Sequence, residues 1–269
     1  MPDIISIRQL YKPVQPAVKH SSGTVVYSES LPEERLQPFI YCYWELRSLP
    51  ALRETFLYRV AADGCIDLFF DRNNPSENLI MGFSKAHTEF PLSAPFHYIG
   101  IRFLPGMLPL IFRLNASVLS NRIEHLETVL PAVSAFIKNQ AGDQISFDKT
   151  RDLFDAFLLK LLAKIRLNAD TRFYQALYRI LESNGTLRIE KDLDAGISQR
   201  QLRRLFEYYV GDTAKSFSKI VRFQHVLRAS AQNLSDKKLF YDAGYYDQAH
   251  FIREFNHFYG ITPGRTFGW

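Results

Sequence analysis

The sequence has few cysteines and no long apolar run. Cys42 and Cys65 are its only cysteines among 269 residues; two are too few for a disulfide framework and suit a reducing cytosol. No stretch approaches the roughly 18 apolar residues that a membrane-spanning helix needs. The N-terminus, MPDIISIRQL, lacks the basic and apolar segments of a secretion signal. These absences predict a soluble cytoplasmic protein with no membrane partner.

Motifs that mark enzymes are scarce as well. There is no glycine-rich phosphate loop, no His-x-His, and GFSKA around Ser84 lacks the second glycine of a nucleophile elbow. His87 and Glu89 offer two metal ligands on one strand face, but a metal site needs three or four, so a surface pair is favoured. Asp63 and Asp67 lie near a turn, where carboxylates usually cap backbone amides. We therefore predict no catalytic site, no metal site and no cofactor.

What the chain does carry is an internal repeat near its C-terminus. SQRQLRRLFEYYVGDTA, which starts at Ser198, aligns without a gap with DQAHFIREFNHFYGITP, which starts at Asp247, and every aligned pair is 49 positions apart. Ser198 and Asp247 are N-cap residues, whose side-chain oxygens accept hydrogen bonds from free backbone amides. Gly211 and Gly260 stand where helices end in the left-handed conformation. Each copy is therefore predicted to be one capped helix.

Each predicted helix has an apolar face and a polar outer face. The apolar residues recur at helical spacing and are expected to be mostly core: Leu202, Leu205, Phe206 and Tyr209 in the first copy, and Phe251, Phe255 and Phe258 in the second. The opposite face carries Arg200, Arg203, Arg204 and Glu207 in the first copy, and Ala249, Ile252, Arg253 and Asn256 in the second. A short helical stretch and a glycine precede each copy, as IEKDLDAG and KKLFYDAG. Two such units in register predict a pair of helix-turn-helix motifs, joined by a helix from Lys215 to Ala231.

The positive charge of the chain is concentrated in the same region. The net charge is +5. Residues 1–169 hold 18 lysines and arginines against 17 acidic residues, whereas residues 170–269 hold 15 against 11. An excess of positive charge in the part that bears the repeat is what a DNA-binding module requires.

This part of the chain resembles a known family. Residues 170–269 are similar to the DNA-binding domain of AraC-type bacterial transcription regulators: AGYYDQAHFIREFNHFYGITP resembles its signature, and GISQRQLRRLFEYYVG with RFQHVLRA resembles the first unit and the joining helix. Three departures stand out: one residue fewer between Ile189 and Ser198, Phe240 where Ala is preferred, and Ala214 in place of Pro. The resemblance implies double-stranded DNA as the partner, a shortened first helix in unit one, and different packing at Phe240.

The first half of the chain has the pattern of β structure. Short runs rich in β-branched and aromatic residues, such as VVYSE, FIYCYWELR, CIDLFFD and YIGIRFLPG, are separated by turn clusters such as DRNNPSEN. This spacing predicts an antiparallel sheet folded into a barrel or a sandwich. After Pro131 the pattern becomes helical. RDLFDAFLLKLLAKIRL is apolar around most of its circumference, so this helix should be buried or paired with another helix.

YCYWELR, AADGCIDLFFD and GIRFLPG resemble a cupin-like domain, without an assigned activity, that precedes AraC-type modules. In that family such a domain often senses a ligand or forms the dimer, which implies a small-molecule effector and a homodimer as partners. We predict an α+β chain in three parts: residues 1–130 form a β-rich sensor or dimerisation domain, 131–169 a helical connector, and 170–269 the DNA-binding domain. The last boundary falls in RLNADTR.

Aromatic residues of the first half allow two interpretations. Tyr41, Tyr43, Trp44 and Phe69 could line a small-molecule cavity inside the sheet structure. They could equally fill that space as packed side chains, which is the favoured interpretation. The sequence therefore identifies no ligand-binding residue.

Together these patterns predict a sequence-specific DNA-binding transcription regulator whose two helix-turn-helix units read adjacent major grooves. The residues predicted to contact DNA lie on the outer faces: Gln199, Arg200, Arg203, Arg204, Gln248, Ala249, His250, Ile252 and Arg253. An arginine there can be a solvent-facing side chain or an ion pair instead, for example Arg203 with Glu207. The alternative function is a ligand-sensing or scaffold protein whose basic helical module no longer reads DNA.

Overall fold

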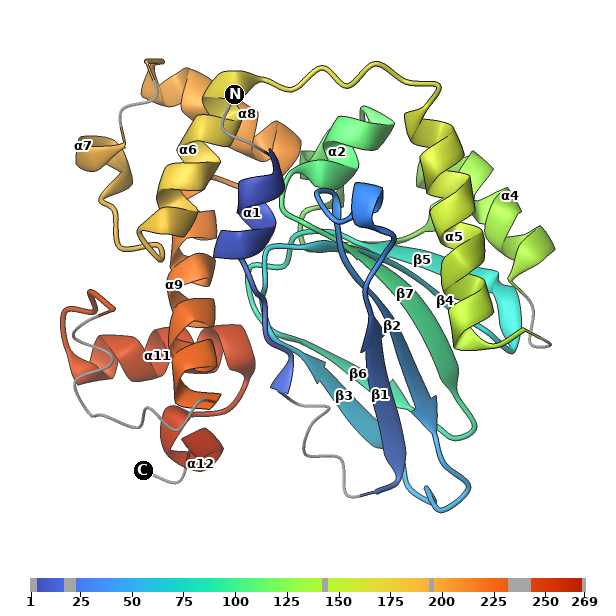
Figure 1. Cartoon of the computed structure of the whole chain (residues 1–269). Helices are drawn as coiled ribbons and strands as arrows, with labels where there is room; N and C mark the ends of the chain where they lie inside the picture. The colour runs from blue at the N-terminus through green and yellow to red at the C-terminus, as the bar shows by residue number, and fades with distance from the viewer. Residues whose placement is uncertain (1–3, 17–22, 142–144, 194–195, 232–242, 268–269) are drawn as a thin grey trace.

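The computed structural model describes residues 4–16, 23–141, 145–193, 196–231 and 243–267. Strands occupy the first half of the chain and helices the second, so the predicted α+β class is confirmed. In Figure 1 the C-terminal helices stand to the left of the sheets, and helices α4 (Pro131–Gln140) and α5 (Phe147–Leu162) stand to the right.

Two antiparallel sheets form the N-terminal half. Of the two predicted arrangements, a barrel and a sandwich, this is the sandwich. The larger sheet has the strand order β1-β2-β7-β4-β5-β8, with β1 Val25–Ser30, β2 Ile40–Ser48, β4 Ile66–Asp71, β5 Asn74–Met81, β7 His97–Phe103 and β8 Ile123–His125. The smaller sheet pairs β3 Phe56–Val60 with β6 Thr88–Leu92. β3 and β6 face the larger sheet across a second, smaller apolar core.

Alternate residues of the large sheet enter different cores, because side chains alternate along a strand. On β2, Tyr43 faces the helices and stacks on Phe154 of α5 with ring centroids 6.1 Å apart, whereas Trp44 faces the small sheet. On β7, Ile101 joins the helix-side core. Gly100 lies under Trp44 so closely that a Cβ atom would come within 2.1 Å of the indole ring. A glycine at this position lets the tryptophan lie against the sheet.

Short helices cover the N-terminal half: α1 Ile4–Leu10, η2 Glu34–Leu36, α2 Met107–Phe112, η3 Ala116–Leu119 and α3 Leu126–Val129. Helix α5 corresponds to the apolar helix predicted around RDLFDAFLLKLLAKIRL. Its Phe157 stacks on Phe136 of α4 with centroids 4.2 Å apart, so the expected pairing with another helix is confirmed. Helix α2 lies inside the segment predicted as β-rich. Its five buried residues, from Met107 to Ile111, pack into the core on every side, and such a run lacks a visible helical period.

The described residues of the C-terminal half form helices joined by loops, without strands: α6 Thr171–Glu182, α7 Ile189–Asp192, α8 Gln199–Tyr209, α9 Ala214–Ala231, α11 Gln248–Tyr259 and α12 Pro263–Phe267. Asp170 caps α6 by accepting a hydrogen bond from Arg172 N at 3.0 Å, inside the predicted boundary segment. The halves nevertheless share one apolar core. Tyr174 Oη donates to Gly106 O at 3.1 Å, and Phe173 lies against the same glycine. The division into separate domains therefore stays a prediction.

Candidate DNA-binding face and interior cavity

Helix α8 has the caps that the sequence predicts. Ser198 Oγ accepts from Gln201 N at 3.3 Å, and Gln201 Oε1 accepts from Ser198 N at 3.2 Å, which completes a capping box. Gly211 follows the helix with φ of 105°, and its N–H donates to Phe206 O at 3.1 Å. The buried face consists of Leu202, Phe206 and Tyr209, with Leu205 half-buried. The first predicted helix is thus confirmed from cap to cap.

Helix α11 repeats this design. Asp247 Oδ1 accepts from His250 N at 2.6 Å, and the helix ends at Gly260 with φ of 83° and a hydrogen bond of 2.7 Å from its N–H to Asn256 O. The predicted apolar residues Phe251, Phe255 and Phe258 are all buried. Two capped helices in one register, each with its apolar face inward, leave their outer faces available for a partner.

Most residues predicted to contact DNA lie on those outer faces: Gln199, Arg200, Arg203 and Arg204 on α8 are exposed, as are Gln248, Ala249, Ile252 and Arg253 on α11. Arg203 donates to Glu207 Oε1 at 2.7 Å, which is the i, i+4 ion pair of the alternative interpretation. In the described parts of the chain, no carboxylate pairs with Arg200, Arg204 or Arg253. Among the arginines predicted to contact DNA, these three are therefore available to bind a phosphate or a base.

His250 differs from the other predicted contacts because it is half-buried. Its ring lies edge-on to Tyr245 with centroids 5.6 Å apart, and its Nε2 is 3.7 Å from a carboxylate oxygen of Glu254. Glu254 is buried, with Arg222 of α9 at 2.7 Å and Lys219 at 3.4 Å. The helical pattern of the sequence does not single out this cluster, although Glu254 follows Phe251 by three residues and so lies at the edge of the buried stripe.

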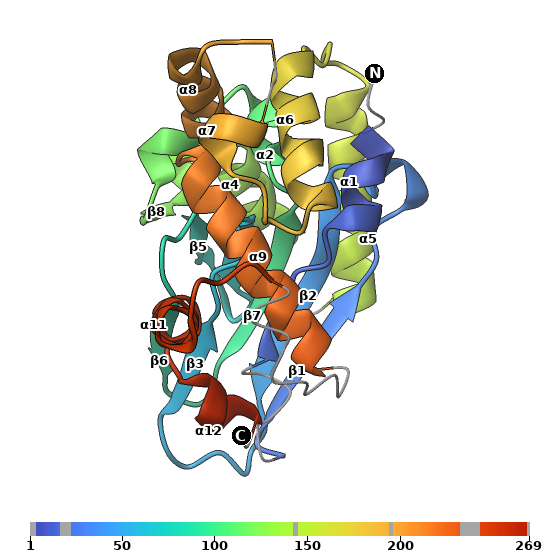
Figure 2. The same cartoon turned by 90° about the vertical axis from the view of Figure 1, so that its left-hand side faces the viewer.

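Helix α9 joins the two units over nearly the predicted range, starting one residue earlier at Ala214. Near its start, Phe217 contacts Phe206 of α8 at 6.2 Å between ring centroids. Further along, Phe223 meets Phe255 of α11 edge-on at 5.4 Å. Figure 2 shows α8 at the top and α11 lower down, with α9 running between them. The joining helix therefore fixes both candidate recognition helices by apolar contacts.

The departures from the family pattern have visible consequences. The first helix of unit one, α7, has four residues, as the missing residue before Ser198 implied. At Ala214, where the family has Pro, Thr213 supports the start of α9 because its Oγ1 accepts from Ser216 N at 3.1 Å. Phe240 lies outside the described residues.

The loop between β3 and β4, residues 61–65, connects the sandwich to the helix-turn-helix units. Ala62 N donates to Phe258 O of α11 at 3.0 Å, and Ala62 O accepts from Gln224 Nε2 of α9 at 2.8 Å. His87 N donates to His257 O at 3.1 Å, so two last-turn carbonyls of α11 find partners in the N-terminal half. The Lys85–Asp212 ion pair, 2.7 Å long, adds a contact close to the end of α8. His87 thus joins the two halves of the chain, and Glu89 pairs with Arg59 at 2.6 Å rather than with His87.

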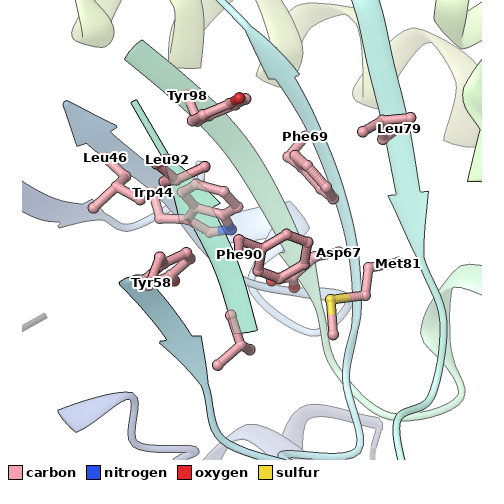
Figure 3. Close-up of a pocket in the computed structure, with 11 residues that line it drawn as sticks. Trp44, Leu46, Tyr58, Asp67, Phe69, Leu79, Met81, Phe90, Leu92 and Tyr98 are labelled. Carbon is pink, nitrogen blue, oxygen red and sulfur yellow. The ribbon is translucent and has the colours of Figure 1, made fainter. Parts of the chain in front are cut away.

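A cavity of about 110 Å³ lies between the two sheets, lined by eleven side chains from six strands. Trp44 and Phe69 line it, together with Tyr58, Phe90 and Tyr98, as Figure 3 shows. Trp44 and Phe69 are also buried in the smaller apolar core, so these two side chains both pack there and border the cavity. Tyr43 and Tyr41 do not line it. Tyr43 faces the opposite side of the sheet and donates to Asp155 at 2.8 Å.

A buried charge cluster lies beside this cavity. Arg102 of β7 is 1% exposed and donates to Asp67 Oδ2 at 2.9 Å, with Asp63 Oδ2 3.4 Å from its Nε. Asp63 also accepts from Cys65 N at 3.0 Å, so the predicted capping holds for Asp63 but not for Asp67, which pairs with the arginine. Burial raises the pKa of Asp67 to about 6, although the Arg102 charge opposes this shift.

Other classes of site find no support in the described ranges. No group of three or more His, Cys, Asp or Glu side chains there is placed to hold a metal ion. Among the same residues, no helix combines the length and apolarity that crossing a bilayer requires.

Comparisons with known proteins agree with this geometry. Residues 194–268 match the family model of a helix-turn-helix domain, and residues 28–125 match a domain of unknown function, DUF6597. No curated protein sequence matches the chain.

The chain is also similar to solved structures of ToxT from Vibrio cholerae. An apo variant shares 11% identity over 92% of this chain and 98% of that one, with a TM-score of 0.45. A form bound to (E)-4-(8-methylnaphthalen-1-yl)but-3-enoic acid shares 10% sequence identity over 91% of this chain and 98% of that one, with a TM-score of 0.45. A form bound to an unsaturated fatty acid shares 12% sequence identity over 92% of this chain and 96% of that one, also with a TM-score of 0.45.

The repeated capped helices and the family match both identify the C-terminal region as a helix-turn-helix domain, the kind of module that binds DNA. Residues 194–268 therefore belong to a helix-turn-helix domain, and a domain of unknown function precedes it over residues 28–125.

Proposed function

We propose that α8 and α11 are recognition helices that enter successive major grooves on one face of the DNA and read its sequence. The observation that carries this proposal is the matched pair of exposed arginines, Arg204 and Arg253, at equivalent positions of two capped helices. Helix α9 between them has 18 residues, or about 27 Å at 1.5 Å per residue. That length is of the order of the roughly 34 Å between successive major-groove contacts.

The outer-face residues fit distinct roles in this proposal. An arginine such as Arg200, Arg204 or Arg253 can donate two hydrogen bonds to guanine O6 and N7. The exposed apolar side chains Ala249 and Ile252 suit thymine methyl groups. The polar residues of the first turns, Gln199 and Gln248, are placed to contact DNA near the helix ends, with Gln199 toward the phosphates; His250 completes the predicted set beside Arg253.

Phosphate contacts have a second candidate source between α7 and α9. A groove of about 320 Å³ there is lined by five basic side chains: Arg188, Lys191, Lys215, Lys219 and Arg222. Several are partly compensated, since Lys215 lies 3.8 Å from Glu190 and Arg222 bonds Glu254. Positive side chains beside a recognition helix position a protein on DNA without reading sequence.

The direct test is selection of binding sites from a random DNA library by the full-length protein. Two recognition helices held by α9 should enrich two blocks of sequence, with centres about 10 base pairs apart. Shortening or lengthening the spacer by half a helical turn should abolish the selected affinity, because the second block would then face away. A single enriched block, or tolerance of the altered spacer, would contradict simultaneous reading by both helices.

Affinity for DNA should also depend steeply on salt. Each phosphate that a basic side chain neutralises releases a counterion, so log affinity should fall linearly with log salt, with a slope of about −0.9 per contact. The excess of 15 basic over 11 acidic residues in residues 170–269 motivates this expectation. Fluorescence anisotropy on one duplex over a series of salt concentrations measures the slope. A slope near zero would exclude the basic faces as the binding surface.

The remaining partners also belong to this proposal. A small-molecule effector would bind in the N-terminal half, where the cavity lies, and a homodimer would form through the same half. Because transcription takes place on the chromosome, we place the protein in the bacterial cytoplasm. The alternative, a sensor or scaffold that no longer reads DNA, is motivated by the four-residue helix α7. It predicts no enriched sequence in the selection experiment.

A further inference from the structure

We propose that the cavity between the two sheets binds a small organic ammonium ion, with its nitrogen directed to Asp67 and its carbon atoms among the aromatic rings. This names the chemical class of the effector that the proposed function places in this half of the chain, and rests on it in that respect; ligand binding can nevertheless be measured without DNA. The lining, the charge of the buried cluster and the size of the cavity each favour this class of ligand.

The lining is an aromatic cage. Five aromatic rings from five strands surround the space: Trp44, Tyr58, Phe69, Phe90 and Tyr98. Phe69 lies close to three of the others, with centroids 6.1 Å from Trp44, 6.5 Å from Phe90 and 6.3 Å from Tyr98. The faces of aromatic rings carry partial negative charge and attract cations, and such cages recognise ammonium groups.

The charge beside the cage has the matching sign. Asp63 and Asp67 together carry two negative charges when ionised, and Arg102 supplies one positive charge, so the cluster has a net charge of −1. Of these three groups, only the Asp67 carboxylate contributes to the cavity lining. Its side chain is 12% exposed, whereas that of Arg102 is 1% exposed. A cation in the cavity would therefore restore neutrality, whereas an anion would add a second uncompensated charge.

The Trp44 indole is part of the surroundings of this carboxylate. Its buried Nε1–H is directed at Asp67 and helps to lower the pKa of the carboxylate, against the effect of burial. In Figure 3 this nitrogen lies on the same side of the cavity as Asp67. The donor therefore favours the ionised form of Asp67, which is the form that attracts a cation.

The size of the cavity limits the ligand. A cavity of about 150 Å³ holds a benzene molecule, which has six non-hydrogen atoms, so about 110 Å³ suits a ligand of roughly four or five. Several lining residues are half-buried, among them Leu79, Met81 and Phe90, so solvent reaches part of the lining. A compact alkylammonium ion is therefore the expected occupant, and a long-chain acid is excluded by both volume and charge.

The pH dependence of binding follows from the groups around Asp67. Those facing it are Arg102 on β7, Asp63 and Cys65 in the loop, Cys42 on β2 and Tyr58 on β3. Burial raises the pKa of Cys42, Cys65 and Tyr58, so these groups stay neutral at physiological pH. Asp67 has a raised pKa of about 6. Affinity for an ammonium ion should therefore increase as the pH rises through this value, because Asp67 loses its proton.

Saturation-transfer NMR on the full-length protein tests the proposal with four probes of similar size: n-butylammonium, tetramethylammonium, 1-butanol and butyrate. We expect n-butylammonium to bind about tenfold or more tightly than 1-butanol, because its N–H groups donate to a carboxylate. Tetramethylammonium, which lacks N–H groups, should rank between them. Equal or tighter binding of butyrate, or no saturable binding of either cation at millimolar concentration, would overturn the proposal.

Variants separate the charge from the cage. Asp67→Asn should weaken n-butylammonium about tenfold or more and leave 1-butanol unchanged, whereas Glu77→Gln, an exposed change on β5, should alter neither. Phe90→Leu, at a half-buried lining residue, should weaken the binding of tetramethylammonium several-fold with little effect on the binding of 1-butanol. This variant provides the test if Asp67→Asn does not fold. If a folded variant keeps the full preference for cations over 1-butanol, the substituted side chain does not contribute to cation binding. If Asp67→Asn and Phe90→Leu both keep that preference, the proposed site is refuted.

Discussion

Arg204→Ala and Arg253→Ala should each weaken binding to the selected DNA site by about 1–3 kcal/mol, with a much smaller loss on random duplex. Both side chains are exposed and unpaired by carboxylates among the described residues, at equivalent positions of α8 and α11. A guanidinium that contacts a base loses specific hydrogen bonds on truncation, whereas on random DNA it contributes mainly through phosphates. Competition binding against a randomised site library measures both losses. Each variant should also relax base preference at one position, and the two positions should lie about 10 base pairs apart.

Two controls accompany this pair. Lys215→Ala, at the start of α9, should weaken all sequences alike if its side chain contacts a phosphate. Arg203→Ala also breaks the ion pair with Glu207, so it tests whether that arginine is held by its neighbour or is available to DNA. If Arg204→Ala and Arg253→Ala weaken binding to the selected site and to random duplex equally, the recognition surface must lie elsewhere in this part of the chain.

Arg102→Met should destabilise the fold by about 3–5 kcal/mol at neutral pH. The guanidinium is 1% exposed and pairs with Asp67 at 2.9 Å, and Asp63 lies 3.4 Å from its Nε. Methionine has a similar length and removes the only positive charge of this cluster, which leaves two carboxylates together in the interior. Urea unfolding followed by circular dichroism measures the difference. Arg35→Met, at a side chain that is 72% exposed, should change stability by less than about 0.5 kcal/mol.

The loss at Arg102→Met should shrink at lower pH. In the folded protein the pKa of Asp67 is already raised to about 6, above the unfolded value of roughly 3.9. The native state therefore binds more protons than the unfolded state between these values, so this group destabilises the fold as the pH rises through 6. Without Arg102 the pKa should rise further, and protonation near pH 5 should relieve much of the penalty. The same loss of stability at about pH 5 and about pH 7.5 would contradict this account.

The two helix-turn-helix units are the part that local sequence predicts best. Ser198 and Asp247 have side chains that cap a helix, Gly211 and Gly260 adopt positive φ after it, and the structure shows both features. These signals act within one or two helical turns, so they do not depend on distant residues. His250 is the exception on the outer face, because Tyr245 and a buried carboxylate draw it partly inward.

The sequence by itself thus determined the helix ends, the apolar stripes and the position of the exposed arginines, since all of these follow from residues close along the chain. The tertiary structure alone decided which face of β2 lines the cavity, why Asp67 pairs with Arg102 35 positions away, and how Ala62 holds α9 and α11 against the sandwich. Alternation along a strand shows that Tyr43 and Trp44 point in opposite directions but not what lies on each side. Only folding brings Arg102 beside Asp67 and closes β3 and β6 over Trp44, because those contacts join strands that no local pattern links.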